Sequence, residues 1–196
     1  MEIINVLFSG VGGQGIILAS KILTKCAFIS GYKVKESELH GMAQRGGSVT
    51  SHVRFGDEVY SPLIPKGKAD FLIALEELEG LRYAYYLRPN GNVILNRKKI
   101  MPSIINPENA SYPEDVKLQL EAMGFHVDSV NAFEMATNLG NAKMENIILM
   151  GMLSQYMPFT ISTWETVIKE SVPAKTIEIN LSAFHKGREL TEGRTL

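Results

Sequence analysis

The feature that most constrains the fold is a glycine-rich stretch at residues 10–15, which has the pattern G-x-G-x-x-G. It directly follows an apolar run at residues 3–8 that predicts a buried strand, and it precedes residues 16–29, where apolar residues recur at helical spacing. A glycine turn between a strand and a helix is typical of nucleotide-binding α/β domains. The free N–H groups at the helix start favour an anion. The candidate ligand-binding residues of this turn are Gly10, Gly12, Gly13, Gln14 and Gly15.

The patterns that follow predict an α/β fold with a mixed sheet. Residues 32–35 are expected to form a second strand, and residues 37–47 a polar loop. Residues 48–55 predict a strand that continues around Gly56 into a second strand at residues 58–64, as a β-hairpin. A hairpin makes the sheet mixed rather than wholly parallel.

The second half of the chain predicts a further β–α–β unit and then helices alone. Strands are expected at residues 70–75, 92–96 and 125–130, with helices between them, and only helices from residue 132 to about 187. The prediction is a three-layer α/β/α Rossmann-like domain with a mixed, mostly parallel sheet and a helical C-terminal third. The length of 196 residues fits a single domain, residues 1–196.

A second polar cluster lies at residues 38–48. Arg45 is a permanent cation with a planar fork of donors, and Gly46 and Gly47 can expose backbone N–H groups beside it. With Gln44, these residues suit a phosphate or a carboxylate. The alternative is a solvated loop in which Arg45 pairs with a nearby carboxylate such as Glu36.

Composition narrows the classes of function. A net charge of −1 predicts no attraction to nucleic acid or to an anionic membrane, and no apolar run reaches the roughly 20 residues of a membrane span. The chain has one cysteine, Cys26, and four scattered histidines without metal-ligand spacing. We therefore expect a cytoplasmic protein, and we assign no metal ligand and no catalytic acid or base.

Four sequence stretches, at residues 10–20, 40–54, 61–70 and 74–82, together carry a family resemblance. In this order they resemble the β subunit of indolepyruvate ferredoxin oxidoreductase, which is similar to the γ subunit or γ domain of other 2-oxoacid ferredoxin oxidoreductases. The resemblance extends over nearly the whole chain.

The resemblance implies a reaction, and it implies which subunit binds the cofactors. A 2-oxoacid such as indolepyruvate is oxidatively decarboxylated to an acyl-coenzyme A, and the electrons reduce ferredoxin. Thiamine diphosphate, Mg²⁺ and 4Fe–4S clusters belong to a large α subunit, so this chain binds no cofactor alone and is inactive alone. We also expect the isolated chain to self-associate as a homodimer through an apolar face.

Three hypotheses stand for the role of the two glycine-containing segments: the first rests on the resemblance, and the other two are alternatives to it. The first is that they face the active site of the α subunit and position the phosphates of coenzyme A or order loops of the partner. The second is an NAD-dependent dehydrogenase that uses the G-x-G-x-x-G turn, with Glu36 on the ribose. The third is a purely structural subunit that only stabilises its partner.

Overall fold

The sheet is six-stranded and mixed, with the strand order β2-β3-β1-β4-β5-β6. The computed structural model describes residues 2–40, 47–101 and 111–193. β1, β4, β5 and β6 are parallel neighbours, whereas β3 is antiparallel to both β1 and β2. The mixed, mostly parallel sheet predicted from the sequence is therefore confirmed. The strands are β1 (Ile4–Val11), β2 (Lys33–His40), β3 (Ser48–Gly56), β4 (Ala69–Ala74), β5 (Leu87–Asn96) and β6 (His126–Val130).

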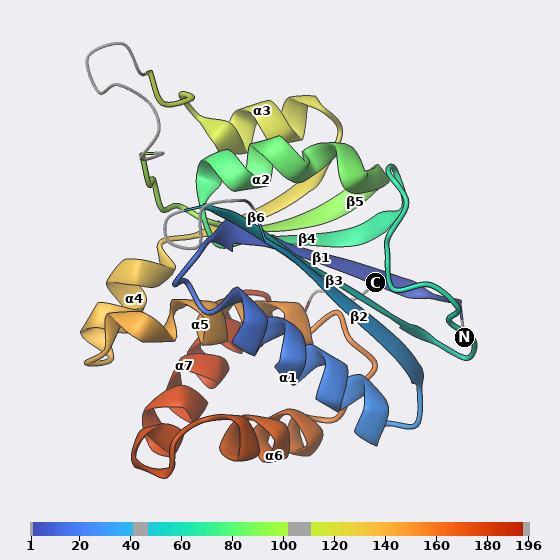
Figure 1. Ribbon diagram of the computed structural model, residues 1–196. Coiled ribbons are helices and arrows are strands. Elements are labelled where there is room, and N and C mark those ends of the chain that lie inside the picture. Colours follow the sequence, from blue (N-terminus) through green and yellow to red (C-terminus); the bar gives the residue numbers. More distant parts are fainter. Residues whose placement is uncertain (1, 41–46, 102–110, 194–196) are drawn as a thin grey trace.

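Helices cover both faces of this sheet, which gives the three layers seen in Figure 1. α2 and α3 lie on one face, and α1 lies with the C-terminal helices on the other. The helical C-terminal third is also confirmed. The helices are α1 (Ile16–Ile29), α2 (Glu77–Tyr83), η1 (Ala84–Tyr86), α3 (Val116–Ala122), α4 (Ala132–Asn138), η2 (Ala142–Met144), α5 (Glu145–Ser154), α6 (Ile161–Ser171), η3 (Ala174–Thr176) and α7 (Ile177–Glu189).

Two apolar cores separate the layers, and alternation along β1 explains both of them. Phe8 points into the core beneath α1 and the C-terminal helices, together with Trp164 and Phe184. Leu7 points into the core beneath α2 and α3, together with Leu72. Because successive side chains of a strand point to opposite faces, a central strand such as β1 is covered on both faces and is therefore mostly apolar.

α5 and α7 pack against each other at two glycines. A Cβ atom built on Gly151 would lie well within 3.0 Å of the carbonyl oxygen of Phe184, and one built on Gly187 would clash in the same way with the carbonyl oxygen of Ile148. The backbones of the two helices therefore approach more closely than any larger residue allows.

The predicted hairpin around Gly56 is wrong. β3 pairs with β1 and β2, while residues 58–64 run outside the sheet without forming a strand. Side chains of β3, rather than a neighbouring strand, form hydrogen bonds with the backbone of this segment. The backbone N–H of Ile64 donates to Nδ1 of His52 (3.2 Å), and Nη1 of Arg54 donates to the carbonyl oxygens of Ser61 and Leu63.

The antiparallel partner of β3 at the edge of the sheet is β2, which is longer than predicted. Residues 37–40, expected to lie in a loop, continue the strand opposite residues 49–52. β2 is rich in charged residues, as is common in edge strands because charge discourages edge-to-edge aggregation. That polarity is what made the segment resemble a loop.

Candidate functional site

The glycine turn lies at a topological switch point of the sheet. It joins the carboxyl end of β1 to α1, and the neighbouring strand β4 leads into α2 on the opposite face. In open α/β sheets the crevice between such diverging connections is the usual place for a ligand. The turn predicted from the sequence is thus in the right position for a binding site.

Gln14 holds the turn together from within. Its Oε1 accepts a hydrogen bond from the backbone N–H of Val11 (2.7 Å), and its Nε2 donates to the carbonyl oxygen of Leu75 (2.8 Å). Gly10 leaves room for this side chain, since a Cβ atom there would lie 2.8 Å from Oε1 of Gln14. The amide of Gln14 therefore ties β1 to the end of β4, so its observed role is structural.

Gly13 and Gly15 have left-handed backbone conformations, with φ of 100° and 78°. Gly13 is exposed, whereas Gly15 precedes the first residue of α1 and packs against Asn146. Nδ2 of Asn146 donates to the carbonyl oxygen of Gly15 (3.1 Å), and a Cβ atom on Gly15 would come within 2.5 Å of that nitrogen. A larger residue would therefore break the contact between this turn and α5.

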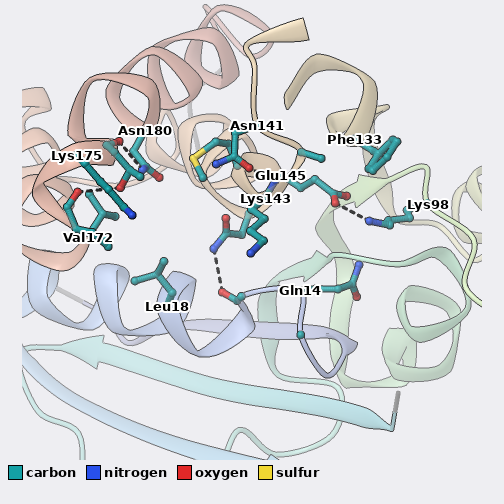
Figure 2. Close-up of a pocket in the computed structure, with 17 residues that line it drawn as sticks. Gln14, Leu18, Lys98, Phe133, Asn141, Lys143, Glu145, Val172, Lys175 and Asn180 are labelled. Carbon is teal, nitrogen blue, oxygen red and sulfur yellow. Dashed lines mark hydrogen bonds and ion pairs between the residues drawn. The ribbon is translucent and has the colours of Figure 1, made fainter. Parts of the chain in front are cut away.

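The start of α1 faces a cleft of about 710 Å³ (Figure 2). No side chain caps the helix, so the N–H groups of its first turn are available to an anion. Figure 2 shows Lys143 and Lys175 on the wall opposite α1, and Lys98 beside Phe133. The lining residues are Gly13, Gln14, Gly15, Leu18, Lys98, Phe133, Asn141, Ala142, Lys143, Met144, Glu145, Asn146, Val172, Pro173, Lys175, Thr176 and Asn180.

The charge of the cleft is positive. Lys98 donates to Oε1 of Glu145 at 2.5 Å, and Nδ2 of Asn96 donates to Oε2 of the same carboxylate at 2.8 Å. Lys143 and Lys175 have no ion pair with any residue that the structure describes. Two uncompensated lysines and a helix N-terminus therefore face the same space, which suits phosphate groups.

The structure brings one end of the second predicted cluster to the glycine turn. The backbone N–H of Gly12 donates to the carbonyl oxygen of Gly47 (3.0 Å). Gln44, Arg45 and Gly46 lie outside the described residues, so their role stays a prediction.

Buried acids line the neighbouring helix start. Glu76 is the N-cap of α2 and accepts from the backbone N–H of Glu79 (2.9 Å) and of Ile100 (3.0 Å) and from the Tyr112 hydroxyl. Burial raises the pKa of Glu79, while the hydrogen bond from Ser48 lowers it. These acids complement the helix dipole and also hold neighbouring segments in place.

The geometry does not fit the dinucleotide hypothesis. β3 lies between β1 and β2, so Glu36 is two strands away from the glycine turn. Its carboxylate accepts from the hydroxyls of Ser20 (2.6 Å) and Thr24 (3.0 Å) on α1. A ribose bound at the turn would therefore not meet this acid.

The described residues do not fit a resident metal centre. They contain no group of three or more histidine, cysteine, aspartate or glutamate side chains that could hold an ion. Cys26 is fully buried, and burial raises the pKa of its thiol to about 12, which disfavours the thiolate that binds iron or zinc. In the parts described, no helix has the length and apolar character needed to cross a membrane.

The lysines that line the cleft were not predicted from the sequence. Lys98, Lys143 and Lys175 lie far from the glycine turn along the chain, and none belongs to a recognisable motif. Only the folding of the helical third against the turn brings them together.

The fold and the site define a class: an α/β domain with a glycine turn, an inserted antiparallel strand and a basic cleft roofed by C-terminal helices. A profile of the family described as pyruvate ferredoxin/flavodoxin oxidoreductase matches residues 5–190. The chain belongs to this family, and the resemblance found in the sequence is confirmed.

Known relatives match over nearly their whole length. The indolepyruvate oxidoreductase subunit IorB of Archaeoglobus fulgidus is 44% identical over 188 residues, which cover 94% of this chain and 93% of that protein. The subunit of the same name from Thermococcus kodakarensis is 41% identical over 192 residues, 95% of each chain. A 2-oxoglutarate synthase subunit KorC of Methanothermobacter thermautotrophicus is 29% identical over 189 residues, 95% of this chain and 94% of that protein.

Solved structures share the fold. The γ subunit of a keto/oxoacid ferredoxin oxidoreductase from Geobacter sulfurreducens has a TM-score of 0.73 at 23% identity, covering 97% of this chain and 99% of that one. A 2-oxoglutarate:ferredoxin oxidoreductase from Magnetococcus marinus has a TM-score of 0.77 at 19% identity; the match covers all of this chain but 32% of that one. The same fold therefore occurs both as a separate chain and as part of a longer one.

Proposed function

We propose that this chain is the smaller subunit of an indolepyruvate ferredoxin oxidoreductase and works in complex with a larger α subunit. Relatives named as subunits of indolepyruvate oxidoreductases at 40–44% identity support this assignment, because they match over 93–95% of their own length. The complex oxidatively decarboxylates an aryl pyruvate to an acyl-coenzyme A and reduces ferredoxin.

The residues of this chain support a location of the redox cofactors in the partner. An iron–sulfur cluster needs about four thiolates, and the chain has one cysteine, which is buried and protonated. When bound in the α subunit, thiamine diphosphate with Mg²⁺ supplies the carbanion chemistry of decarboxylation and the clusters carry the electrons. This chain contributes binding and orientation rather than the cofactors.

The single observation that carries this role is the basic cleft in front of α1. Coenzyme A bears phosphate groups, and the cleft offers the free N–H groups of the first helical turn together with Lys143 and Lys175. We propose that this surface, together with Gly47 and with Gln44, Arg45 and Gly46, which precede it in the sequence, positions these phosphates beside the active site of the α subunit.

The test is reconstitution. The purified chain is added to its α subunit, and reduction of a viologen dye is followed with indolepyruvate and coenzyme A; the chain alone, with and without NAD, is the control. We expect turnover only in the mixture. Tight binding of NAD by the chain alone, with no gain in the mixture, would overturn the assignment in favour of the dehydrogenase hypothesis.

A pair of lysine variants tests the role of the cleft. In the assembled complex, Lys143→Ala combined with Lys175→Ala is expected to raise the KM for coenzyme A roughly tenfold, which corresponds to about 1.4 kcal/mol. Lys169→Ala, an exposed lysine of α6 that does not line the cleft, is the matched control. If the double variant lowers only the yield of complex and leaves the KM unchanged, the purely structural hypothesis is favoured.

A further inference from the structure

The first residue of β3 is held by α2 through its side chain. The hydroxyl of Ser48 donates to Oε2 of Glu79 at 2.5 Å and lies 2.9 Å from the hydroxyl of Tyr83. Ser48 is thus bonded to two side chains, one helical turn apart, on the helix that follows β4.

The same residue is in direct register with the glycine turn. Ser48 lies opposite Val11, the last residue of β1. Just beyond the ends of these two strands, the backbone N–H of Gly12 donates to the carbonyl oxygen of Gly47. Any shift of Ser48 therefore moves the acceptor that fixes Gly12. Three contacts thus connect α2 to the glycine turn: the hydrogen bond from Ser48 to Glu79, the pairing of Ser48 with Val11, and the hydrogen bond from Gly12 to Gly47.

The burial of Glu79 shows that this arrangement does more than complement a helix dipole. The side chain is only 6% exposed, whereas an acid that serves the dipole alone can stay in water. A buried carboxylate is stable only when it is paired or hydrogen-bonded. Ser48 and Arg82, the latter 3.4 Å away, supply these partners.

We propose that Ser48, Glu79 and Tyr83 form a clamp that positions the carbonyl of Gly47 against the glycine turn, and that they are positioning residues for the anion site of the complex. The functional part of this inference rests on the proposed role of the cleft and of Gly47 in binding coenzyme A. The structural part stands on the contacts alone, so the two can fail separately.

Hydrogen exchange of the Gly12 amide in the full chain, followed by NMR, reports on the clamp directly. In Ser48→Ala this amide is expected to exchange roughly tenfold faster, because the acceptor Gly47 is no longer held. Ser48→Thr retains the hydroxyl and should restore slow exchange.

Tyr112→Phe is the matched control for a general loosening of α2. It removes a hydroxyl that donates to Glu76 at the start of the same helix and accepts from the backbone N–H of Leu78, but it leaves the Ser48 contacts intact. We expect the exchange of the Gly12 amide to be unchanged in this variant. Equal acceleration in Ser48→Ala and Tyr112→Phe would mean that the helix, not the clamp, controls Gly12, and the proposal would be overturned.

Steady-state kinetics of the assembled complex then test the functional part. For Ser48→Ala we expect a roughly fivefold higher KM for coenzyme A at nearly unchanged kcat, with recovery in Ser48→Thr; a merely structural residue would change the amount of active complex instead. Faster exchange at Gly12 with an unchanged KM would overturn the functional part while leaving the clamp. Unchanged exchange in Ser48→Ala would overturn the clamp itself.

Discussion

Replacing Gly187 by alanine tests the closest contact between two helices of the protein. The new methyl group would overlap the carbonyl oxygen of Ile148 and lie about 3.1 Å from the Cα of Gly151, so α5 and α7 would have to move apart. Overpacking typically costs about 1–3 kcal/mol, and the upper end applies here because backbone atoms cannot rotate out of the way. Alanine recovers about 1 kcal/mol of helix propensity. We therefore expect a net loss of about 2 kcal/mol in the free energy of unfolding.

The chain carries its own reporter for this measurement. Its single tryptophan, Trp164, is fully buried and lies with its ring centroid 5.8 Å from that of Phe184 on α7. Urea unfolding followed by Trp164 fluorescence gives the free energy, and a loss of about 2 kcal/mol corresponds to a Tm lower by about 4–8 °C for a chain of this size. Ser182→Ala, at an exposed position of the same helix, controls for propensity and should be neutral or slightly stabilising. A Gly187→Ala variant as stable as the parent would refute the close crossing of α5 and α7.

Two further predictions follow from buried titratable groups. Burial lowers the pKa of His52, whose Nδ1 accepts from the backbone N–H of Ile64, so the contribution of His52 to stability is present above the unfolded pKa of about 6.5 and is lost as the pH falls through the folded pKa. The urea midpoint of unfolding should therefore fall between pH 7 and pH 5, and it should fall less in His52→Gln. Equal pH profiles for the two proteins would contradict this prediction. The thiol of Cys26 has its pKa raised to about 12 by burial and should react with a thiol reagent only as fast as the chain unfolds; rapid labelling of the folded chain would show that the site is open.

The parts of the fold that the sequence predicted correctly are those with strong local signals. The turn after β1 and the unit β4–α2–β5 each combine a buried apolar strand with an adjacent helix or glycine signal. The hairpin was misplaced because the partner of a strand is a long-range property. Nothing local in residues 48–56 shows that β3 inserts between β1 and β2 rather than folding back at Gly56.

The candidate site was predicted only in part for a similar reason. The glycine turn was identified because all its residues are contiguous, and the structure adds that Gln14 is engaged inside the protein. Lys143, Lys175 and Asn146 escaped notice because they reach the turn from more than 120 residues away in the chain. Isolated lysines in a helical region are far more often solvated surface residues than ligand contacts.

The contact between Asn146 and Gly15 means that the cleft can form only after a late part of the sequence has been synthesised. The glycine turn at residues 10–15 is synthesised well before the walls of the cleft, most of which come from residues 133–146 and 172–180. Until these have been synthesised, the face of the sheet under α1 stays partly uncovered, and such transiently exposed apolar surface makes nascent chains prone to aggregation. A ligand or partner that uses this cleft can therefore bind only after residue 180 has been synthesised and the C-terminal helices have packed against the turn.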